Sequence, residues 1–529
     1  MEINIARLNT IITEYSSFAL YGCGEIAKET FGALLKLNKE PVFCLVTDKS
    51  NSESVFQDRI PIYSIAEKEE QIRKEDILLI LAVNERNKSE IQVLLQNYNI
   101  TEYISIAECE RNSLPYIEYF ENLSEENRIK EIASSYIDVC QNYNISVKEE
   151  TLKIKRCIEK GEYDSQKIVF VIGALTPRVI KVARALIDLN YKIEVYFGPR
   201  ATLQEICISE LNNLGIECNK CRSYEELIYY LLTSRGKAIH LFTNRGHSYF
   251  DKMIIGFKNL LSPIVYDEYD IIGAFYTNEP QEIIDNEKYC LENAAGICNR
   301  GFEIEYLREK HNYDIQGSFI QLHDCCNDIQ YNNAGISEDE LSLCYVGQVL
   351  DQRKWPEFAE GFRELADRCK INKCHFHVYP HRWDTKEHVF YMDIEGNNEY
   401  FHFHKPVSHE QLCKEISLYD YGVWPLMRKV LKQKTFVYNT KEKHIYAATN
   451  KFFDYLDAGL PIIAPAPRKL LQCLEPMGLL LEWAVDEYDF DELRRRKKGL
   501  KENVILEREK LKMSNQIHKL VDLYESVSK

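Results

Sequence analysis

The chain has 529 residues, too many for one hydrophobic core, and this length suggests three or four domains. Hydrophobic residues make up 45% of the sequence and aromatic residues 12%, which is ample for packed cores and excludes wholesale disorder. A formal net charge of −16 excludes the basic face that a nucleic-acid-binding protein needs, so no nucleic-acid partner is expected.

Targeting and redox signals favour a cytoplasmic protein. The sequence has no apolar run of the ~18 residues that a membrane span needs, and Met1–Ile5 lacks the basic and apolar regions of a signal peptide. The 17 cysteines are spread over the whole length, which favours reduced and mostly buried thiols over a disulfide scaffold.

Residues 1–116 show a first α/β pattern. Phe18–Tyr21, Val42–Val46 and Ile77–Ala82 are short apolar strands, and a helical run follows the first of them. Continuous apolar strands that alternate with helices predict a parallel sheet covered on both faces. Residues 117–165 are polar and helical in pattern, which predicts a connector.

Two further βα series follow, in residues 166–335 and 336–505, and a C-terminal helix is expected over 506–529. The strands expected in these series are Lys167–Gly173, Ile193–Phe197, Ala238–Phe242, Ile264–Tyr266, Ser342–Gly347, His375–Tyr379, Tyr421–Trp424 and Ile462–Ile463. We therefore predict an α/β fold of three Rossmann-like units. Ligands of such folds bind at the carboxyl ends of the strands, so the main site is expected in the cleft between the last two units.

The segment Thr449–Ala464 is the most informative part of the chain. It combines an amphipathic helix, a stop at Gly459 and a short apolar strand. The apolar face of this helix carries Phe452, Phe453 and Leu456. Asp454 and Asp457 take the other face, where Asp457 is expected to be solvated. The N–H groups at the start of such a helix suit a diphosphate.

This layout resembles the nucleotide-sugar signature of GT-B glycosyltransferases, in particular those of family 4-like type (glycosyl transferases group 1). The short form of that signature reads Asn-Lys-hydrophobe-hydrophobe-Glu-Tyr-Leu-x-x-Gly-x-Pro, and Asp454 stands where the family usually has Glu. The resemblance implies that the last two units form a GT-B pair, with 166–335 as the acceptor domain and 336–505 as the donor domain. It implies a nucleoside-diphosphate sugar as donor substrate and no required cofactor.

The same resemblance assigns roles at the start of this helix. Asp454 is expected to hold the ribose, because a carboxylate can accept two hydroxyl hydrogens at once. Asn450 and Lys451 are expected near the diphosphate. Tyr446 replaces the second acidic residue of the longer family signature.

A second group of donor residues lies in the loops after two strands. After Gly347, Gln348 occupies the family's Arg position and Arg353 that of its Lys, so Arg353 is expected to clamp a phosphate. Lys354 either shares this work or points to solvent. Phe403–Ser408 resembles the segment that lines the base pocket. The predicted donor-binding residues are thus Gly173, Gly347, Arg353, Lys354, Lys405, Val407, Asn450, Lys451 and Asp454.

The acceptor domain is expected to supply the catalytic groups. The candidates are His247, in a loop after the third strand of that domain, and Asp267 and Glu268, at the end of the fourth. One of the carboxylates would hydrogen-bond an acceptor hydroxyl or stabilise positive charge at the anomeric carbon. Signatures of this kind occur mainly in retaining transferases, so retention is expected by resemblance.

The N-terminal unit carries a weaker nucleotide signal. Gly22-x-Gly24-x-x-Ala27 follows a strand and opens a helix, and Asp48 ends the next strand, as in the dinucleotide-binding fingerprint. We interpret this unit as an accessory nucleotide-binding domain, with an empty structural scaffold as the alternative.

Histidines and basic residues form two further clusters. Seven of the 13 histidines lie between His375 and His409, and two His-Phe-His triplets place their imidazoles on one strand face. Because the sequence fixes no third partner, no metal site is predicted. Arg494–Lys498 is either a solvated helix face or a peripheral contact with anionic lipid at the inner membrane face.

These observations predict a glycosyltransferase that moves a sugar from a nucleoside-diphosphate sugar to a glycan, a lipid-linked acceptor or a protein glycoconjugate. Its expected pathway is the assembly of bacterial surface polysaccharide. Two alternatives remain: an NAD-dependent oxidoreductase or epimerase that uses the N-terminal unit, and a non-catalytic nucleotide-sugar binding protein.

Overall fold

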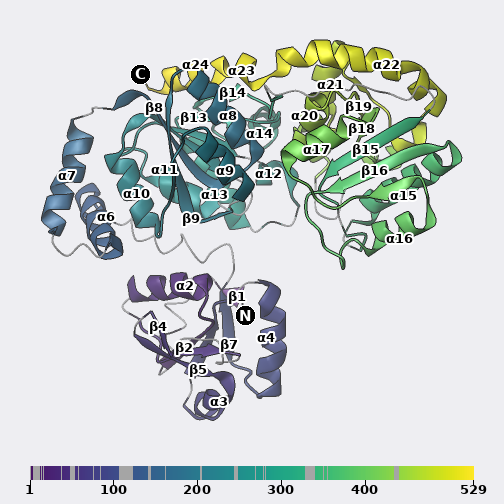
Figure 1. Cartoon of the computed structure of the whole chain (residues 1–529). Helices are drawn as coiled ribbons and strands as arrows, with labels where there is room; N and C mark the ends of the chain where they lie inside the picture. The colour runs from purple at the N-terminus through teal and green to yellow at the C-terminus, as the bar shows by residue number, and fades with distance from the viewer. Residues whose placement is uncertain are drawn as a thin grey trace. The chain divides into compact units, whose positions relative to one another are not determined.

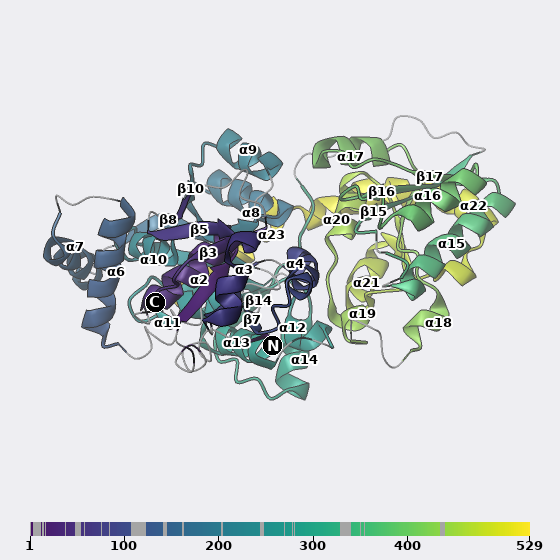
Figure 2. The ribbon, with the colours of Figure 1, turned by 90° about the horizontal axis from the view of Figure 1, so that it is seen from below.

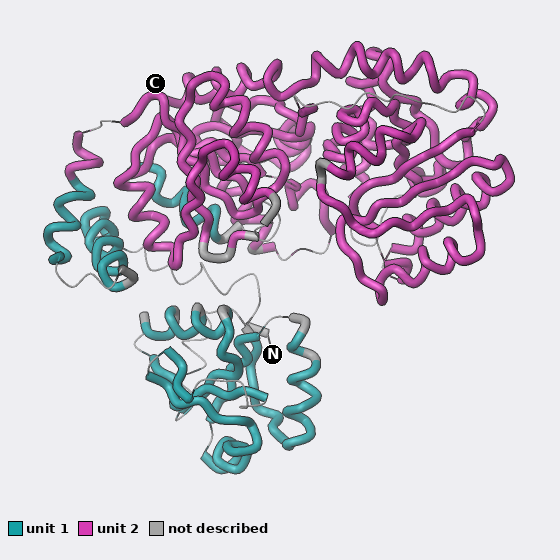
Figure 3. The backbone as a smooth tube through the Cα atoms, viewed as in Figure 1, with its two compact units in different colours: residues 1–155, 246–259 teal, residues 156–245, 260–529 magenta. Residues whose placement is uncertain are grey.

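The structure is a computed structural model of the chain and contains two compact units (Figure 3). Unit 1 comprises residues 1–155 and 246–259, and unit 2 comprises residues 156–245 and 260–529. The structure describes residues 2–3, 12, 15, 17–36, 39–47, 54–57, 59–75, 77–83, 85–106, 123–140, 145–160, 163–202, 205–243, 248–268, 270–277, 279, 281–327, 340–349, 351–353, 355–433 and 440–528.

Unit 1 contains a seven-stranded sheet of order β1-β7-β6-β2-β3-β5-β4, in which only β4 pairs in antiparallel fashion. The strands are β1 Glu2–Ile3, β2 Ser17–Tyr21, β3 Cys44–Val46, β4 Val55–Phe56, β5 Ile60–Ser64, β6 Ile77–Leu81 and β7 Tyr103–Ile106. The helices are α2 Glu25–Lys36, α3 Ile65–Lys74, α4 Glu85–Asn97, α6 Glu125–Cys140, α11 Ser248–Gly256 and most of α7 Val147–Glu159. Successive residues of β2 enter the cores on opposite faces of the sheet, which is why the strand is apolar throughout.

Unit 2 begins with a second sheet, of order β10-β9-β8-β11-β12-β13-β14, all parallel. Its strands are β8 Asp164–Ala174, β9 Lys192–Thr202, β10 Cys218–Lys220, β11 Gly236–Thr243, β12 Ile264–Glu268, β13 Gly296–Asn299 and β14 Ser318–Gln321. The connecting helices are α8 Pro177–Asp188, α9 Glu205–Asn213, α10 Tyr224–Thr233, α12 Ile272–Phe275, α13 Gln281–Asn293 and α14 Glu303–Lys310. We call this sheet with its helices the first lobe of unit 2.

The second lobe of unit 2 has a parallel sheet of order β17-β16-β15-β18-β19-β20. Its strands are β15 Leu341–Gly347, β16 Cys374–Pro380, β17 Phe401–Phe403, β18 Tyr421–Val423, β19 Ile462–Ile463 and β20 Leu480–Leu481. Its helices are α15 Pro356–Ile371, α16 Val389–Asn397, α17 His409–Ile416, α18 Arg428–Leu431, α19 Lys443–Tyr446, α20 Asn450–Asp457 and α21 Arg468–Leu474. Helices α15 and α16 pack on one face, and α20 and α21 with the end of α17 pack on the other (Figure 2).

The C-terminal segment links the two lobes. Helix α22 (Phe490–Glu507) packs on the second lobe, and α23 (Met513–Gln516) and α24 (His518–Val527) return to the first (Figure 1). Between them the 3₁₀ turn Arg508–Leu511 divides the helix expected over 506–529. Cys326 fixes the turn, since its N–H donates to Leu511 and its carbonyl accepts from Met513 (2.8 and 2.9 Å).

All three sheets share one strand order, in which the first strand of each βα series lies inside the sheet and the chain then reverses direction. This is the Rossmann order, and the predicted fold class of three Rossmann-like units is confirmed. Unit 2, with two such lobes and a C-terminus that returns to the first, has the GT-B architecture. The domain boundaries given above stay predictions. Among the helices of the described residues, none has the length and apolar character to span a bilayer.

Candidate functional site

A lysine lies at the topological switch point of the second lobe. The strand order reverses between β15 and β18, and ligands of such sheets bind outside the carboxyl ends of the strands at that point. Strand β15 ends at Gly347, and Trp424 follows β18 directly. The ammonium of Lys451, from the first turn of α20, lies 4.6 Å from the centre of the Trp424 ring. It also lies 5.6 Å from the centre of the Tyr345 ring.

Gly347 ends β15 beside this lysine. Its φ of +113° is one that residues with a side chain rarely adopt, so the backbone conformation favours glycine. A Cβ there would lie 3.5 Å from Cε of Lys451, at ordinary van der Waals distance, so the lysine stem packs directly against the strand end.

Tyr455 holds α20 over the switch point. Its hydroxyl accepts from the N–H of Val346 in β15 (3.1 Å) and donates to the carbonyl of Val423 in β18 (3.0 Å). The Tyr455 ring lies on Gly422, where a Cβ would come within 2.1 Å of the ring. Because one buried side chain bonds both central strands, the first turn of α20 is fixed relative to both strand ends.

The local sequence also explains where α20 stops. Gly459 adopts a φ of +75°, and the N–H of Leu460 donates to the carbonyl of Tyr455 (2.8 Å). This is the left-handed ending that glycine favours, and Pro461 follows it.

The amine of Lys451 is held in an unfavourable environment. Burial and the positive charge of Lys443 lower its pKa to about 8, against the opposing effects of Asp454 and Asp270. Among the described residues, the indole N–H of Trp424 is buried without a hydrogen-bond acceptor. The amine of Lys451 donates to the neutral hydroxyl of Thr449 (3.3 Å), so an anionic ligand would supply the negative charge that this partner does not, and an acceptor for the Trp424 indole.

Two more cations approach the site from the boundary between the lobes. Lys443 of α19 donates to Tyr276 (2.8 Å) and pairs with Asp270 (3.4 Å), both of the first lobe. Arg300, which follows β13 and is 3% exposed, also pairs with Asp270 (2.9 Å). Burial lowers the pKa of Lys443, but Asp270 and Tyr276 together outweigh it, so the net shift of this pKa is upward. Lys443 therefore stays charged beside Lys451.

Backbone contacts hold the two lobes together beside these cations. The N–H of Phe302 donates to the carbonyl of Tyr446 (2.9 Å), and the N–H of Thr440 donates to the carbonyl of Phe275 (3.0 Å). The carboxyl of Glu303, next to Phe302, is 2% exposed, and burial raises its pKa to about 8. A carboxylic acid that is protonated at neutral pH thus lies in the same region.

The two acidic residues of α20 differ in their surroundings. Asp454 is half-buried, and its charge raises the pKa of Lys181 in the first lobe, together with that of Asp457. The expectation that Asp457 is solvated is wrong. Its side chain is 1% exposed, accepts from the N–H and the side-chain amide of Asn327 (2.8 Å each), and lies 3.7 Å from Lys181. Burial between the lobes explains the difference, because partners distant in sequence cover the polar face of the helix.

The other predicted donor residues are dispersed. Arg353 is 75% exposed and forms a bidentate pair with Asp351, and its phosphate role stays a prediction. Lys405 is exposed, whereas Val407 packs in the core beside α17 and α20. Gly173 is buried within β8, and Asn450 is exposed at the start of α20; Lys354 lies outside the described residues.

The predicted catalytic carboxylates are buried in the first lobe. Asp267 is 2% exposed, pairs with Arg178 (2.9 Å) and lies 3.2 Å from Nε2 of His240. Burial raises the pKa of Asp267, but Arg178 and His240 together outweigh it, so the net shift of this pKa is downward. Glu268 accepts from the hydroxyl of Tyr266 (2.7 Å). His247 lies outside the described residues. Because structural partners hold both carboxylates, their catalytic roles stay predictions.

Unit 1 has its own switch point, between β2 and β6. Gly22, with a φ of +118°, follows β2, and a Cβ there would lie 2.7 Å from the carbonyl oxygen of Ala82, so packing alone requires this glycine. A Cβ on Gly24 would meet no atom within 4 Å, so space is open there. Asp48 lies outside the described residues.

The basic run Arg494–Lys498 does not form one exposed face. Lys497 is 4% exposed, donates to the carbonyl of Glu340 (2.7 Å) and lies 3.7 Å from Asp420. Arg495 pairs with Glu492 on the same helix. Part of the run therefore stabilises the second lobe.

Sequence reasoning missed Lys443, Arg300 and Trp424 as site residues. Trp424 ends a predicted strand and belongs to the stretch that resembles the lining of the base pocket, and Arg300 follows β13, which was not predicted. The position after a strand is the signal that would have indicated both.

Comparisons with known proteins give only distant likenesses in structure. No protein-family model matches the chain, and no curated protein matches it. A glycosyltransferase from Rickettsia africae is similar over 69% of this chain and all of its own, at 10% identity and a TM-score of 0.46. Anabaena HepE in complex with UDP is similar over 67% of this chain and 98% of its own, at 10% identity and a TM-score of 0.45. The pneumococcal O-GlcNAc transferase GtfA is similar over 55% of this chain, at 11% identity and a TM-score of 0.38. The chain spans only 56% of the length of GtfA. Such distant likenesses carry no assignment of function, which rests on the geometry of the site.

Proposed function

We propose that the chain is a glycosyltransferase that binds a nucleoside-diphosphate sugar at the start of α20. Lys451 would contact the diphosphate, together with the N–H groups that a helix start leaves without intrahelical partners. Asp454 would accept the ribose hydroxyls. Lys443 and Arg300 would add positive charge to the phosphates from the boundary between the lobes.

The observation that carries this proposal is the position of Lys451 at the switch point of the second lobe, against Gly347 and Trp424. A half-buried amine whose pKa is lowered to about 8 gains stability from an anion at its open side. A diphosphate fits because it presents several oxygens, which can accept from the amine and from backbone N–H groups together.

The finer parts of the proposal concern the acceptor and the reaction. Asp267 or Glu268, with His247, would face the acceptor hydroxyl, and transfer would retain the anomeric configuration. The acceptor would be a glycan, a lipid-linked sugar or a protein glycoconjugate in bacterial surface polysaccharide assembly, reached from the cytoplasm. Product analysis by NMR tests the stereochemistry, and an inverted anomeric centre would refute retention.

A titration of the full chain with sugar nucleotides tests donor binding. Thermal shift over a panel of nucleoside-diphosphate sugars selects the ligand, because a compound that binds the folded state raises the apparent melting temperature. The dissociation constant is then measured for Lys451→Met, which keeps the apolar stem and removes the charge. We expect it to rise by about tenfold or more, since a charged hydrogen bond contributes ~1.5–3 kcal/mol.

The matched control is Lys74→Met, at an exposed lysine of unit 1 that pairs with Glu70. It should leave the dissociation constant unchanged. Equal affinities of Lys451→Met and wild type, or no binding by any member of the panel, would refute the proposal.

We also propose that unit 1 binds a nucleotide at its own switch point, as an accessory domain. The open space at Gly24 favours this. Gly24→Val in the full chain would fill that space. If Lys451→Met still binds NADH or another nucleotide, adding Gly24→Val to it should abolish that binding. Unchanged nucleotide binding in the Gly24→Val, Lys451→Met double variant would exclude it.

A further inference from the structure

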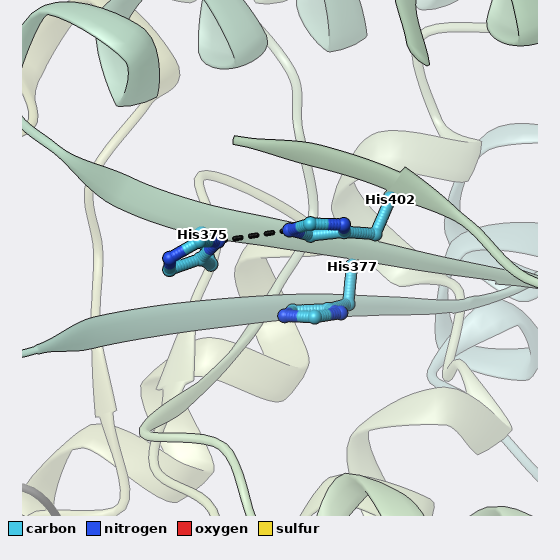
Figure 4. A group of neighbouring side chains, drawn as sticks. All are labelled: His375, His377 and His402. Carbon is cyan, nitrogen blue, oxygen red and sulfur yellow. Dashed lines mark hydrogen bonds between the residues drawn. The ribbon is translucent and has the colours of Figure 1, made fainter. Parts of the chain in front are cut away.

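Four histidines lie side by side on one face of β16, β17 and the residue that follows β17, at the edge of the second-lobe sheet. They are His375, His377, His402 and His404, and all are half-buried. The two strands are parallel, with His377 directly opposite His402. Figure 4 shows three of these rings, from His375, His377 and His402, close together above the strands.

The sequence alternation forces this cluster. Phe376, Val378, Phe401 and Phe403 point into the core formed with α15 and α16. Successive side chains of a strand point to opposite faces, so the histidines between them share the other face. Each His-Phe-His triplet has only two histidines, and the pairing of the two strands brings a third histidine from the other triplet beside them.

The ring nitrogens are close enough to share a metal ion after a small adjustment. Nδ1 of His375 lies 2.8 Å from Nε2 of His402. One ligand nitrogen each from His375, His377 and His402 all lie within 4.8 Å of one another. In a tetrahedral zinc site the nitrogens stand ~3.3 Å apart, because each Zn–N bond is about 2.0–2.1 Å. Rotation of the rings about their side-chain bonds spans the difference.

The fourth histidine orients the cluster. Nδ1 of His377 lies 2.9 Å from Nε2 of His404, which leaves Nε2 of His377 for a ligand. Histidines that bind metals commonly use their second nitrogen in such a hydrogen bond. Tyr419 stacks on the His377 ring, with centres 4.2 Å apart, and limits its rotation.

We propose that His375, His377 and His402 form a binding site for a divalent transition-metal ion of the class that prefers imidazole, with Zn²⁺ as its first candidate. Three neutral nitrogens suit Zn²⁺, Co²⁺ or Ni²⁺ and do not suit Mg²⁺ or Ca²⁺, which prefer oxygen ligands. Water would complete the coordination. The ion would clamp the edge strand β17 to β16. This site is independent of the proposed transfer reaction.

Co²⁺ binding to the full chain, stripped of metal with a chelator, tests the proposal. Co²⁺ is the probe because its absorption spectrum distinguishes nitrogen ligands from the thiolates of the 17 cysteines. We expect one Co²⁺ per chain with ligand-field bands and no sulfur charge-transfer band. Competition with Zn²⁺ should remove these bands.

The variants His375→Gln and His402→Gln should each raise the dissociation constant by at least about tenfold, the size of effect that loss of even an outer partner produces. His518→Gln, at an exposed histidine of α24, is the matched control and should bind as wild type does. Absence of one-to-one binding, a thiolate spectrum, or unchanged affinity in a folded ligand variant would overturn the proposal. If both variants fail to fold, the wild-type spectrum and stoichiometry decide.

Discussion

Replacement of Lys451 by Met should stabilise the protein at neutral pH while it weakens donor binding. The ammonium of Lys451 lies over the Trp424 and Tyr345 rings, and the apolar side chain of methionine can pack against the same rings. The variant removes a charge that burial disfavours, together with its contacts to the rings and its hydrogen bond to Thr449. Most substitutions of half-buried residues destabilise a protein, so a gain in stability would distinguish a binding residue from a structural one.

The magnitude follows from the pKa of Lys451, which is lowered from 10.5 to about 8. Each pKa unit corresponds to ~1.4 kcal/mol, so the charged amine costs at most about 3.5 kcal/mol in the folded state. Because the folded pKa lies below the unfolded value, the unfolded chain binds more protons between pH 8 and 10.5. The wild-type free energy of unfolding should therefore rise with pH in that window, relative to the variant.

Urea unfolding followed by circular dichroism measures this difference. At pH 7, Lys451→Met should be more stable by about 2–3 kcal/mol, and the advantage should shrink as the pH approaches 10. Lys74→Met, at an exposed surface pair, should show neither effect. A variant less stable than wild type at pH 7, or an advantage that does not change with pH, would contradict the reasoning.

Three further predictions concern α20. Tyr455→Phe removes two buried hydrogen bonds to the backbone of β15 and β18, and should lower the free energy of unfolding by about 2–4 kcal/mol in urea; an effect below ~1 kcal/mol would mean that the hydroxyl does not join the strands. Asp457→Ala leaves Lys181 buried without its carboxylate and should cost about 3–5 kcal/mol, whereas a neutral result would exclude an ion pair between the lobes. Asp454→Ala should keep the native circular dichroism spectrum and lose donor affinity in calorimetry, and unchanged affinity would refute the ribose role.

The central strands were predictable because they are apolar on both faces. Ile77–Ala82 and Lys167–Gly173 match β6 and β8 to within a few residues. Strands near the sheet edges, such as β10 and β14, were missed because they are short and less apolar: Cys218–Lys220 and Ser318–Gln321 have no fully buried residue. Their existence depends on pairing with distant strands, which local pattern does not encode.

The start of α20 was predictable because its signature is local. Lys451, Asn450 and Asp454 lie within five consecutive residues, and a helix with a glycine stop follows from spacing alone. The partners of Lys451 were not predictable, since Lys443 reaches the site only through its pair with Asp270 of the other lobe. The prediction that Asp457 is solvated was wrong for the same reason. Tertiary contacts, not helix periodicity, decide whether a polar face meets water.

A structure of the full chain bound to a nucleoside-diphosphate sugar tests the central claim most directly. We expect the diphosphate to lie against the first turn of α20, within hydrogen-bond distance of the amine of Lys451, with the ribose on Asp454. A ligand bound only at Gly22 and Gly24 of unit 1, with the amine of Lys451 still between the two aromatic rings and without an anion, would contradict the account.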